Sequence, residues 1–523
     1  MRRAVASLVA IALALFCCAF AMRVPTLAAD DAFVASVEMP EVRPSLLLRA
    51  NAVTGSGLGA PSSTLNARVL SYLHDWVGLF AMGQSLAAGY QGNPPVNTTQ
   101  VGNSIQLYND AGYPQDAADP TWMVKPLVAP ERADEFTTNQ LAIYPKNIGG
   151  ETSDVCLINS IDLLATAAGY SGFTLAASNP SQSGMAYAFI CFGGINNPAA
   201  SDVQAIEAAV YKRLAGSTPF TVLAIALNHG ESDSNHVSPA YYNSLTTWWS
   251  DYQSHIKVGV TGQANAIPFI ITQQIAWPPP VGLSSTGENA SALDVYQFCQ
   301  DNPTKCILVG SKAAGHYAGD HLHEVQHSYC NQGESEAHAL WTWMNTGAWS
   351  PIWPLTVKLV GNVVTLTVNV PYGPLQFDGT LTGPHLAGAY WGDNGTGFGG
   401  AGHTGWTAGK GFECWSGGTL GTAIGITALS ITSNPSGPNV TATIQVTCAS
   451  TPDTIAYAHT ADDFNGGAGD ALGGWGDGNP IKIGNPILDS DPYTGLITHD
   501  ALPNRMVTFR CASLSGTASP CHE

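Results

Sequence analysis

The sequence predicts an α/β protein in which a three-layer α/β/α sandwich with a five-stranded parallel sheet is followed by an all-β, β-sandwich-like domain. Between about Val77 and Met344, short apolar runs alternate with longer amphipathic ones. This alternation is typical of strands that cross over through helices into a parallel sheet. After the segment Pro351–Pro354 the pattern changes to alternating strands without helices, which predicts a second, β-rich domain.

Five apolar runs predict the strands of the parallel sheet, because buried parallel strands are continuous aliphatic or β-branched stretches. These runs are Val77–Met82, Phe173–Ala177, Phe220–Leu227, Ile267–Thr272 and Cys306–Val309. Amphipathic stretches predict helices at Asp154–Ala168, Asp202–Leu214, Ala240–Ile256, Ala290–Gln300 and Val325–Met344. Residues 90–147 are rich in Pro, Asn, Asp and Thr. They predict an insertion over the carboxyl edge of the sheet, where long loops usually shape substrate sites.

The second domain is predicted from alternating strand patterns separated by glycine-rich loops. The strands are predicted at Leu355–Leu359, Val363–Val370, Ile426–Ser433, Asn439–Thr447 and Met506–Arg510. Glycine dominates the loops at 392–422 and 464–484, in which Trp391, Trp406, Trp415 and Trp475 lie. These indoles either stack on sugar rings or pack against other aromatic groups, and the sequence leaves both interpretations open.

The N-terminus has the features of a secretory signal peptide. Met1-Arg2-Arg3 precedes an apolar run that ends in the small-x-small pattern Ala19-Phe20-Ala21, which predicts a signal peptide at 1–21, or to 29 if cleavage follows Ala28-Ala29. An uncleaved anchor is the weaker reading, because the run is marginal for a spanning helix. The predicted organisation continues with a leader or linker at 30–70, a hydrolase domain at 71–350 and a β-rich accessory domain at 351–523. The protein is therefore expected to be secreted, either to the periplasm or outside the cell.

Cysteine usage agrees with an oxidising compartment. The chain has 11 cysteines, and Cys17 and Cys18 leave with the signal peptide, so nine remain. Disulfides persist in such a compartment, and an odd number leaves one cysteine unpaired or bridging two chains. Short separations favour the pairs Cys299–Cys306 and Cys511–Cys521, and a Cys414–Cys448 pair could staple the C-terminal region.

The charge balance restricts the classes of partner. The 523 residues include 38 acidic and 19 basic side chains, which give a formal net charge of −19. This excess of negative charge disfavours nucleic acid and anionic membranes. No segment after the signal peptide could cross a bilayer, so an integral membrane protein is not expected. A neutral polymer such as a polysaccharide fits the composition better, while the oligomeric state stays open.

A serine follows the first predicted strand directly. Ser85 lies in Gly83-Gln84-Ser85, with Gly89 shortly after it. The carboxyl edge of an open α/β sheet is where such proteins bind ligands. A serine at this edge becomes a nucleophile when a base activates it and donors stabilise the oxyanion. The sequence therefore has to supply both a base and donors.

Two further motifs lie at the same edge. Asn228-His229-Gly230-Glu231 follows the third predicted strand and offers His229 as a side-chain donor. Asp320-His321-Leu322-His323 follows the fifth strand. There a carboxylate three residues before a histidine can orient the imidazole, so Asp320 and His323 supply the orienting group and the base.

These three motifs, in this order, resemble those of the SGNH hydrolases, specifically the sialate O-acetylesterase-like branch with its carbohydrate acetylesterases. The resemblance covers about residues 77–345 and implies an SGNH-type fold with Ser85 as nucleophile, His323 as general base and acid, and Asp320 as the residue that orients His323. It also implies an oxyanion hole formed by the Ser85 amide, the Gly184 amide and the His229 side chain. Gly83, Gln84, Gly230 and Glu231 would support these groups, and no cofactor or metal is expected. His229 departs from the glutamine of the branch, and Ser183-Gly184 departs from its glycine pair.

Other interpretations of the same residues remain. His316, His321 and His327 compete with His323 for the role of base, and Asp320, His321 and His323 together could hold a metal. Acidic residues from Asp462 to Asp477 could hold calcium, although they lack the twelve-residue loop pattern. A near-copy of the block that begins at His229, Gln332–Ser335, is interpreted as helix surface, because no apolar strand precedes it.

Three functions follow from this set. The first is hydrolysis of O-acetyl or other short acyl esters, and the resemblance alone names the acetyl group and the sugar. The second is a lipase, arylesterase or thioesterase, which the same residues would serve with a more apolar pocket. The third is a glycan-binding protein without catalysis.

Overall fold

The computed structural model describes residues 65–108, 116–131, 150–234, 238–274, 290–312, 323–377, 409–418, 421–459 and 487–521. The predicted signal peptide at 1–21, its extension to 29 and most of the leader at 30–70 lie outside these residues. Within the described part of the chain, no helix combines the length and the apolarity needed to cross a membrane.

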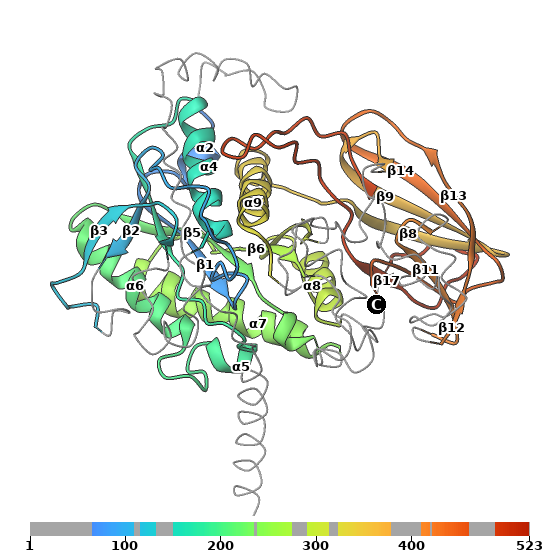
Figure 1. The fold of residues 1–523 in the computed structure, drawn as a ribbon, viewed down its shortest axis with the longest axis horizontal. Helices are drawn as coiled ribbons and strands as arrows, with labels where there is room; N and C mark the ends of the chain where they lie inside the picture. The colour runs from blue at the N-terminus through green and yellow to red at the C-terminus, as the bar shows by residue number, and fades with distance from the viewer. Residues whose placement is uncertain are drawn as a thin grey trace, which may run out of the picture. The chain divides into compact units, whose positions relative to one another are not determined.

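A seven-stranded mixed sheet has the strand order β3-β2-β4-β1-β5-β6-β7 (Figure 1). Five parallel strands coincide with the predicted ones: β1 (Asp75–Gly83), β4 (Phe173–Ser178), β5 (Phe220–Asn228), β6 (Phe269–Gln273) and β7 (Cys306–Ser311). The predicted five-stranded sheet is nevertheless incomplete, because β2 (Ile105–Tyr108) and β3 (Met123–Pro126) extend it beside β4. Both come from the predicted insertion, and each has only 4 residues without a long apolar run.

Helices cover both faces of this sheet, and the strands divide their apolar side chains between two cores. On one side, α4 (Ser153–Ala167) and α9 (Gln326–Thr346) share a core with Ala226 of β5. On the other side, α6 (Ala200–Ala215), α7 (Ala240–Tyr252) and α8 (Ala290–Asp301) pack on a core that contains Ile225 and Leu227. The alternation along β5 is the period of two that a strand buried on both faces requires.

Local sequence explains where the helices end. α6 stops before Gly216, whose φ of 64° lies in the region that glycine adopts most readily, and Lys212 and Arg213 occupy its last turn. α9 ends at Gly347, which takes the left-handed conformation with φ of 85°. The predicted helix at Ala240–Ile256 continues beyond α7 as a π-helical segment, η5 (Gln253–Thr261).

The close crossing of α4 and α9 corrects the interpretation of Gln332–Ser335. The segment is helical, but Gln332, Gly333 and Glu334 are buried rather than on the surface. A Cβ on Gly333 would lie 1.9 Å from the carbonyl oxygen of Ser153, so only glycine allows this approach. A disulfide between Cys156 and Cys330 joins the two helices at the same crossing.

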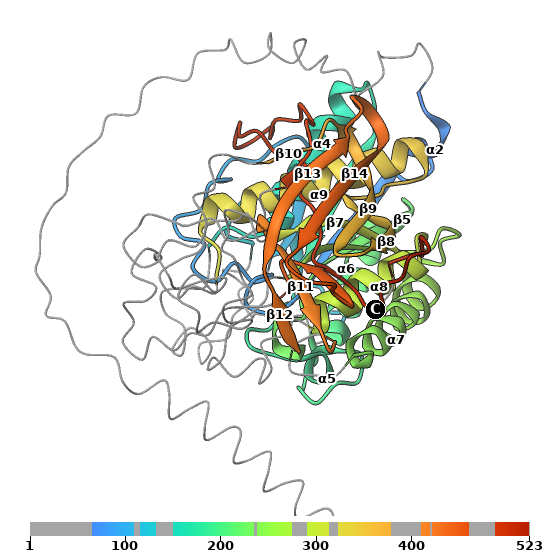
Figure 2. The ribbon, with the colours of Figure 1, turned by 90° about the vertical axis from the view of Figure 1, so that its right-hand side faces the viewer.

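The C-terminal region consists of separate antiparallel sheets. The sheet in Figure 2 has the order β13-β14-β9-β8, with β8 (Trp353–Val360), β9 (Val363–Gly373), β13 (Ile426–Ser433) and β14 (Gly437–Cys448). A second sheet has the order β12-β11-β15-β17, with β11 (Phe412–Ser416), β12 (Thr422–Ile424), β15 (Thr454–Tyr457) and β17 (Phe509–Cys511). Strands β10 (Gln376–Phe377) and β16 (Ile487–Leu488) form a short pair. These sheets agree with the predicted α/β region followed by a β-rich region.

Both disulfides that short separations favour are formed, and so is the suggested Cys414–Cys448 pair. Disulfides join Cys299 to Cys306, Cys414 to Cys448 and Cys511 to Cys521. The Cys414–Cys448 disulfide links β11 of one sheet to β14 of the other. Cys191 has a free thiol. Trp415 is only 1% exposed and belongs to the core, so the interpretation of this indole as a sugar-stacking group is wrong, while Trp391, Trp406 and Trp475 lie outside the described residues.

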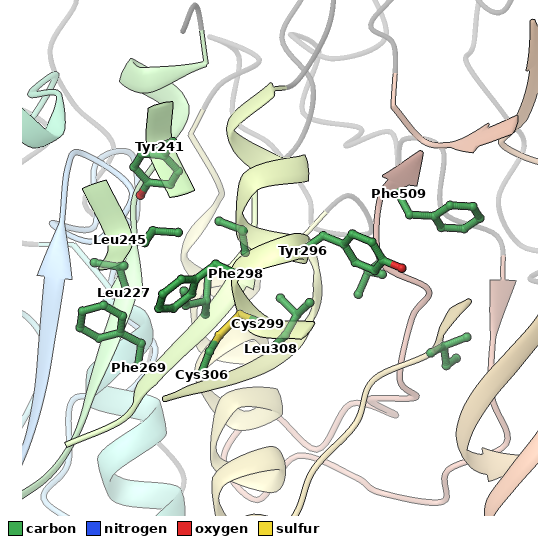
Figure 3. Close-up of a cluster of buried hydrophobic side chains, with 14 of the residues drawn as sticks. Leu227, Tyr241, Leu245, Phe269, Tyr296, Phe298, Cys299, Cys306, Leu308 and Phe509 are labelled. Atoms are coloured by element: carbon green, nitrogen blue, oxygen red, sulfur yellow. A yellow bond between two sulfur atoms is a disulfide. The ribbon is translucent and has the colours of Figure 1, made fainter. Parts of the chain in front are cut away.

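The end of the chain packs against the α/β region. Figure 3 shows Leu227, Phe269 and Phe298 together in one core, with Tyr296 of α8 on the side of Phe509. Gln273 at the end of β6 receives a hydrogen bond from the Thr508 amide at 2.6 Å and returns one to the Thr508 carbonyl at 2.9 Å. These reciprocal bonds satisfy a fully buried side-chain amide, which would otherwise be costly to bury.

Candidate active site

Ser85 lies in a tight turn that two glycines make possible. It follows β1 directly and is 7% exposed. A Cβ on Gly83 would lie 2.0 Å from the carbonyl oxygen of Asn228, and a Cβ on Gly89 would lie 2.4 Å from the carbonyl oxygen of Glu151. Gly89 also has a φ of 70°. The turn can therefore form only with the small residues that the motif contains.

The structure brings Ser85 and His323 together although 238 residues separate them. Ser85 Oγ and His323 Nε2 lie 2.7 Å apart, and the contact is buried. His323 is 6% exposed and lies just before α9. This is the separation at which an imidazole can take the proton of a serine hydroxyl.

Of the three competing histidines, His327 is the one that the structure describes. His327 Nε2 lies 2.7 Å from Asp500 Oδ2 at an exposed position. His316, His321 and the predicted orienting residue Asp320 lie outside the described residues. Among the residues that the structure describes, no group of three or more His, Cys, Asp or Glu side chains could hold a metal ion.

His229 is buried among aromatic residues, and both of its ring nitrogens contact groups of the protein. Nδ1 lies 2.8 Å from the Tyr241 hydroxyl and Nε2 lies 3.0 Å from the Met185 carbonyl oxygen. A carbonyl only accepts, so Nε2 carries the hydrogen. Burial raises the pKa of Tyr241 well above its usual value, so this hydroxyl stays protonated and donates to Nδ1. In this tautomer Nε2 donates its hydrogen to the Met185 carbonyl, and Asp233 Oδ2 lies 3.7 Å from the same nitrogen.

Gly184 lies one residue before that acceptor. It is exposed and has a φ of 72°. The loop that carries Gly184 is bonded to the turn of Ser85, since the Gln182 amide donates to the Gly83 carbonyl at 3.2 Å. His229 thus holds the loop that carries Gly184 from one side, and Gly83 holds it from the other.

The supporting residues Gln84 and Glu231 form a buried network with a lysine. Gln84 Nε2 donates to Glu231 Oε2 at 3.0 Å, and Gln84 Oε1 accepts from the Ser232 amide at 3.3 Å. Lys312 Nζ lies 2.5 Å from Glu231 Oε1 and 2.6 Å from Asn228 Oδ1. The lysine compensates the charge of Glu231, which would be costly to bury alone. Gly230, with a φ of 124°, leaves room for Gln274, whose Nε2 would lie 2.4 Å from an added Cβ.

Two further carboxyl groups are buried close to this lysine. Burial raises the pKa of Glu324, the residue after His323, to about 8, and the positive charge of Lys312 opposes part of that rise. Burial also raises the pKa of Glu336 to about 7, against hydrogen bonds from Gln332 and Thr272. Protonated forms of these two groups therefore persist near neutral pH.

Lys312 and Tyr90 were not identified from the sequence. Lys312 directly follows β7, and the chain has few basic residues, so a lysine at the carboxyl end of a predicted strand was the available signal. Tyr90 packs on His323, with ring centroids 4.2 Å apart. Only its position after the serine turn could have suggested this contact.

Fold and site together define an α/β protein with a buried serine–histidine pair at the carboxyl edge of its sheet. No protein-family model matches the chain, and no curated protein matches it by sequence. A carbohydrate acetylesterase from Xanthomonas citri is structurally similar, with a TM-score of 0.48, 12% identity and coverage of 84% of this chain and 81% of that one.

Two other solved structures are similar at lower scores. A protein from Arabidopsis thaliana has a TM-score of 0.37 and 12% identity, covering 51% of this chain and 98% of its own. The protein NanS has a TM-score of 0.33 and 11% identity, covering 52% of this chain and 98% of its own. At such scores and identities, the chemistry of the site has to be argued from its own residues.

Proposed function

We propose that this protein is a secreted serine esterase that hydrolyses O-acetyl or other short acyl esters, with a carbohydrate as the alcohol. Ser85 is the nucleophile, His323 the general base and acid, and Asp320 the group that orients His323. The main support is the 2.7 Å separation of Ser85 Oγ and His323 Nε2 in a buried setting. The choice of a carbohydrate as the alcohol rests on the resemblance of the three motifs, and the acidic composition is compatible with a neutral polysaccharide.

Each step moves one proton through His323. Ser85 Oγ attacks the acyl carbonyl carbon while His323 Nε2 takes the hydroxyl proton, which gives a tetrahedral oxyanion. When this intermediate collapses, the bond to the sugar oxygen breaks and His323 protonates that oxygen. Water then attacks the acyl-enzyme, again with His323 as base, and the carboxylic acid and free Ser85 are released.

The amides of Ser85 and Gly184 are the proposed oxyanion donors. His229 serves this hole by holding the Met185 carbonyl, and thereby the loop of Gly184, at 3.0 Å. It becomes a direct donor only if substrate displaces that carbonyl. Gln84 and Glu231 keep the nucleophile turn in place.

The test measures acetate release from acetylated xylan, O-acetylated sialate and acetylated exopolysaccharide by the purified protein and its Ser85→Ala variant. We expect Ser85→Ala to lower kcat by about 10⁴-fold or more, since nucleophile and base act as a unit. Ser254→Ala is the matched control, because that exposed hydroxyl only bonds the Ser250 carbonyl. A serine-directed phosphonate is expected to label Ser85.

Two alternatives give different results. Turnover of long-chain acyl esters or thioesters without acetate release would indicate the lipase, arylesterase or thioesterase alternative. Glycan binding that survives Ser85→Ala, with no turnover of any ester, would indicate a binding protein. Failure of the phosphonate to label Ser85 would contradict the mechanism itself.

A further inference from the structure

Tyr90 connects the nucleophile turn to the segment that carries the base. Its amide donates to the Ser85 carbonyl at 3.0 Å. Its carbonyl accepts from the Tyr329 hydroxyl at 2.8 Å, and Tyr329 is fully buried in the first turns of α9. The main chain of Tyr90 is therefore fixed at both ends by the two elements whose side chains meet in the site.

The side chain of Tyr90 packs on the imidazole of His323. The ring centroids lie 4.2 Å apart and the ring planes are inclined by 50°. Tyr90 is half-buried, whereas His323 is 6% exposed. The tyrosine ring thus covers one side of the group that must stay within hydrogen-bond reach of Ser85.

The loop after Tyr90 is rigid for reasons independent of this ring contact. Glu151 Oε2 accepts from the amides of Val96 and Asn97 at 2.6 and 2.7 Å. The Glu151 amide donates to the Gly92 carbonyl at 2.8 Å. Because this fully buried glutamate fixes the loop, removing the Tyr90 ring leaves the backbone path in place.

We propose that the ring of Tyr90 is a positioning element for His323. An imidazole turns about two side-chain torsions, and Ser85 supplies only one of the contacts that hold it. The Tyr90 ring blocks rotation away from the serine and so keeps the imidazole within reach of the hydroxyl proton. This role rests on the proposed function, because it concerns the base of the same reaction.

The ring, rather than the hydroxyl, is expected to matter. Tyr90→Phe keeps the ring, and we expect it to retain more than about half of the wild-type kcat. Tyr90→Leu removes the ring, and we expect kcat to fall about 10- to 100-fold with KM within about 3-fold, because a small misplacement of a reacting group has effects of this size. The rate of phosphonate labelling of Ser85 is expected to fall in parallel with kcat.

Tyr72→Leu is the matched control, because Tyr72 packs on Trp343 with centroids 5.3 Å apart and lies outside the site. A crystal structure of Tyr90→Leu tests the role without any substrate. We expect that His323 Nε2 is displaced beyond hydrogen-bond distance of Ser85 Oγ in this variant. Full kcat in Tyr90→Leu, equal losses in the Phe and Leu variants, a change confined to KM or an unmoved imidazole would each overturn the role. Absence of labelling in the wild-type protein would instead contradict the proposed function.

Discussion

The turn that carries Ser85 and the segment that carries His323 are held in place by different kinds of contact. The serine turn is fixed by its own sheet. The Gln84 amide bonds the Asn228 carbonyl at the end of β5, at 3.4 Å, and Asn179, just after β4, donates to the Ala87 carbonyl at 2.8 Å. Asn228 is the last residue of β5 and Asn179 directly follows β4, and both strands pair directly with β1.

The base segment depends on contacts far along the chain. His323 precedes α9, which is fixed by the Cys156–Cys330 disulfide, across 174 residues. Its Glu334 is fully buried and accepts hydrogen bonds from the amides of Ile497 and Thr498 at 2.7 and 3.1 Å. The comparison teaches that Ser85, the proposed nucleophile, is placed by its neighbours in the sheet, whereas His323, the proposed base, is placed by contacts between distant parts of the chain.

We expect the largest effect from Gly83→Ala, which disturbs the turn that carries Ser85. The added Cβ would lie 2.0 Å from the Asn228 carbonyl, which is backbone and has no room to move. We expect kcat/KM to fall about 10³-fold or more, because the turn shifts relative to His323. Gly516→Ala is the control, since the nearest atom to its added Cβ would be the Leu359 carbonyl oxygen at an ordinary contact distance of 3.7 Å. Ester hydrolysis by Gly83→Ala at the wild-type rate would contradict the expected clash between the added Cβ and the Asn228 carbonyl.

Lys312→Met tests the buried network of Gln84, Glu231 and Lys312. Removing the ammonium leaves Glu231 buried without its positive partner, and we expect the free energy of unfolding to fall by about 3–5 kcal/mol. In the double variant Lys312→Met with Glu231→Gln, a neutral amide replaces the carboxylate and can still accept from Gln84. We expect it to regain most of the lost stability in denaturant titrations. A double variant no more stable than Lys312→Met would mean that the lysine acts through a group other than Glu231.

The smallest effect is expected in the pH dependence of the stability, which concerns the segment that carries His323. Glu324 and Glu336 lie on the base side, and burial raises their pKa values to about 8 and about 7. The folded state therefore binds these protons more tightly than the unfolded state. Their contribution is fully present below the unfolded pKa, near 4.5, and is lost as pH rises to about 8.

We expect the Tm measured by calorimetry to fall by about 3–6 °C between pH 5 and pH 8.5. Glu324→Gln keeps a neutral side chain at all pH values, so its Tm should decline less over the same interval. A Tm that rises across this interval in the wild-type protein would contradict the raised pKa values.

Features that depend on neighbouring residues were predictable from the sequence. The apolar runs of β1 and β5 end shortly before Ser85 and His229, so both residues could be placed at one edge of the sheet. The spacing of Asp320 and His323 suggested a base and its orienting group, although Asp320 lies outside the described residues and its contact with His323 stays a prediction.

Features that depend on long-range packing were not predictable. The Cys156–Cys330 pair has no local signal, and the burial of Gly333 becomes clear only when α4 crosses α9. The partners of His229 are equally non-local, since Met185 and Tyr241 come from other elements. Strands β2 and β3 were missed because the pairing of β2 with β4 and of β3 with β2, rather than their own hydrophobicity, makes them part of the sheet.

The contact of Glu334 with Ile497 and Thr498 determines when α9 can reach its final packing during folding. Synthesis delivers α9 to the folding chain long before these donors, which lie 163 and 164 residues later. Until they arrive, the carboxylate of Glu334 lacks the amides that compensate its burial, and the final packing of α9 is unfavourable. The helix that follows His323 therefore reaches its final packing only after residues 497 and 498 have been synthesised.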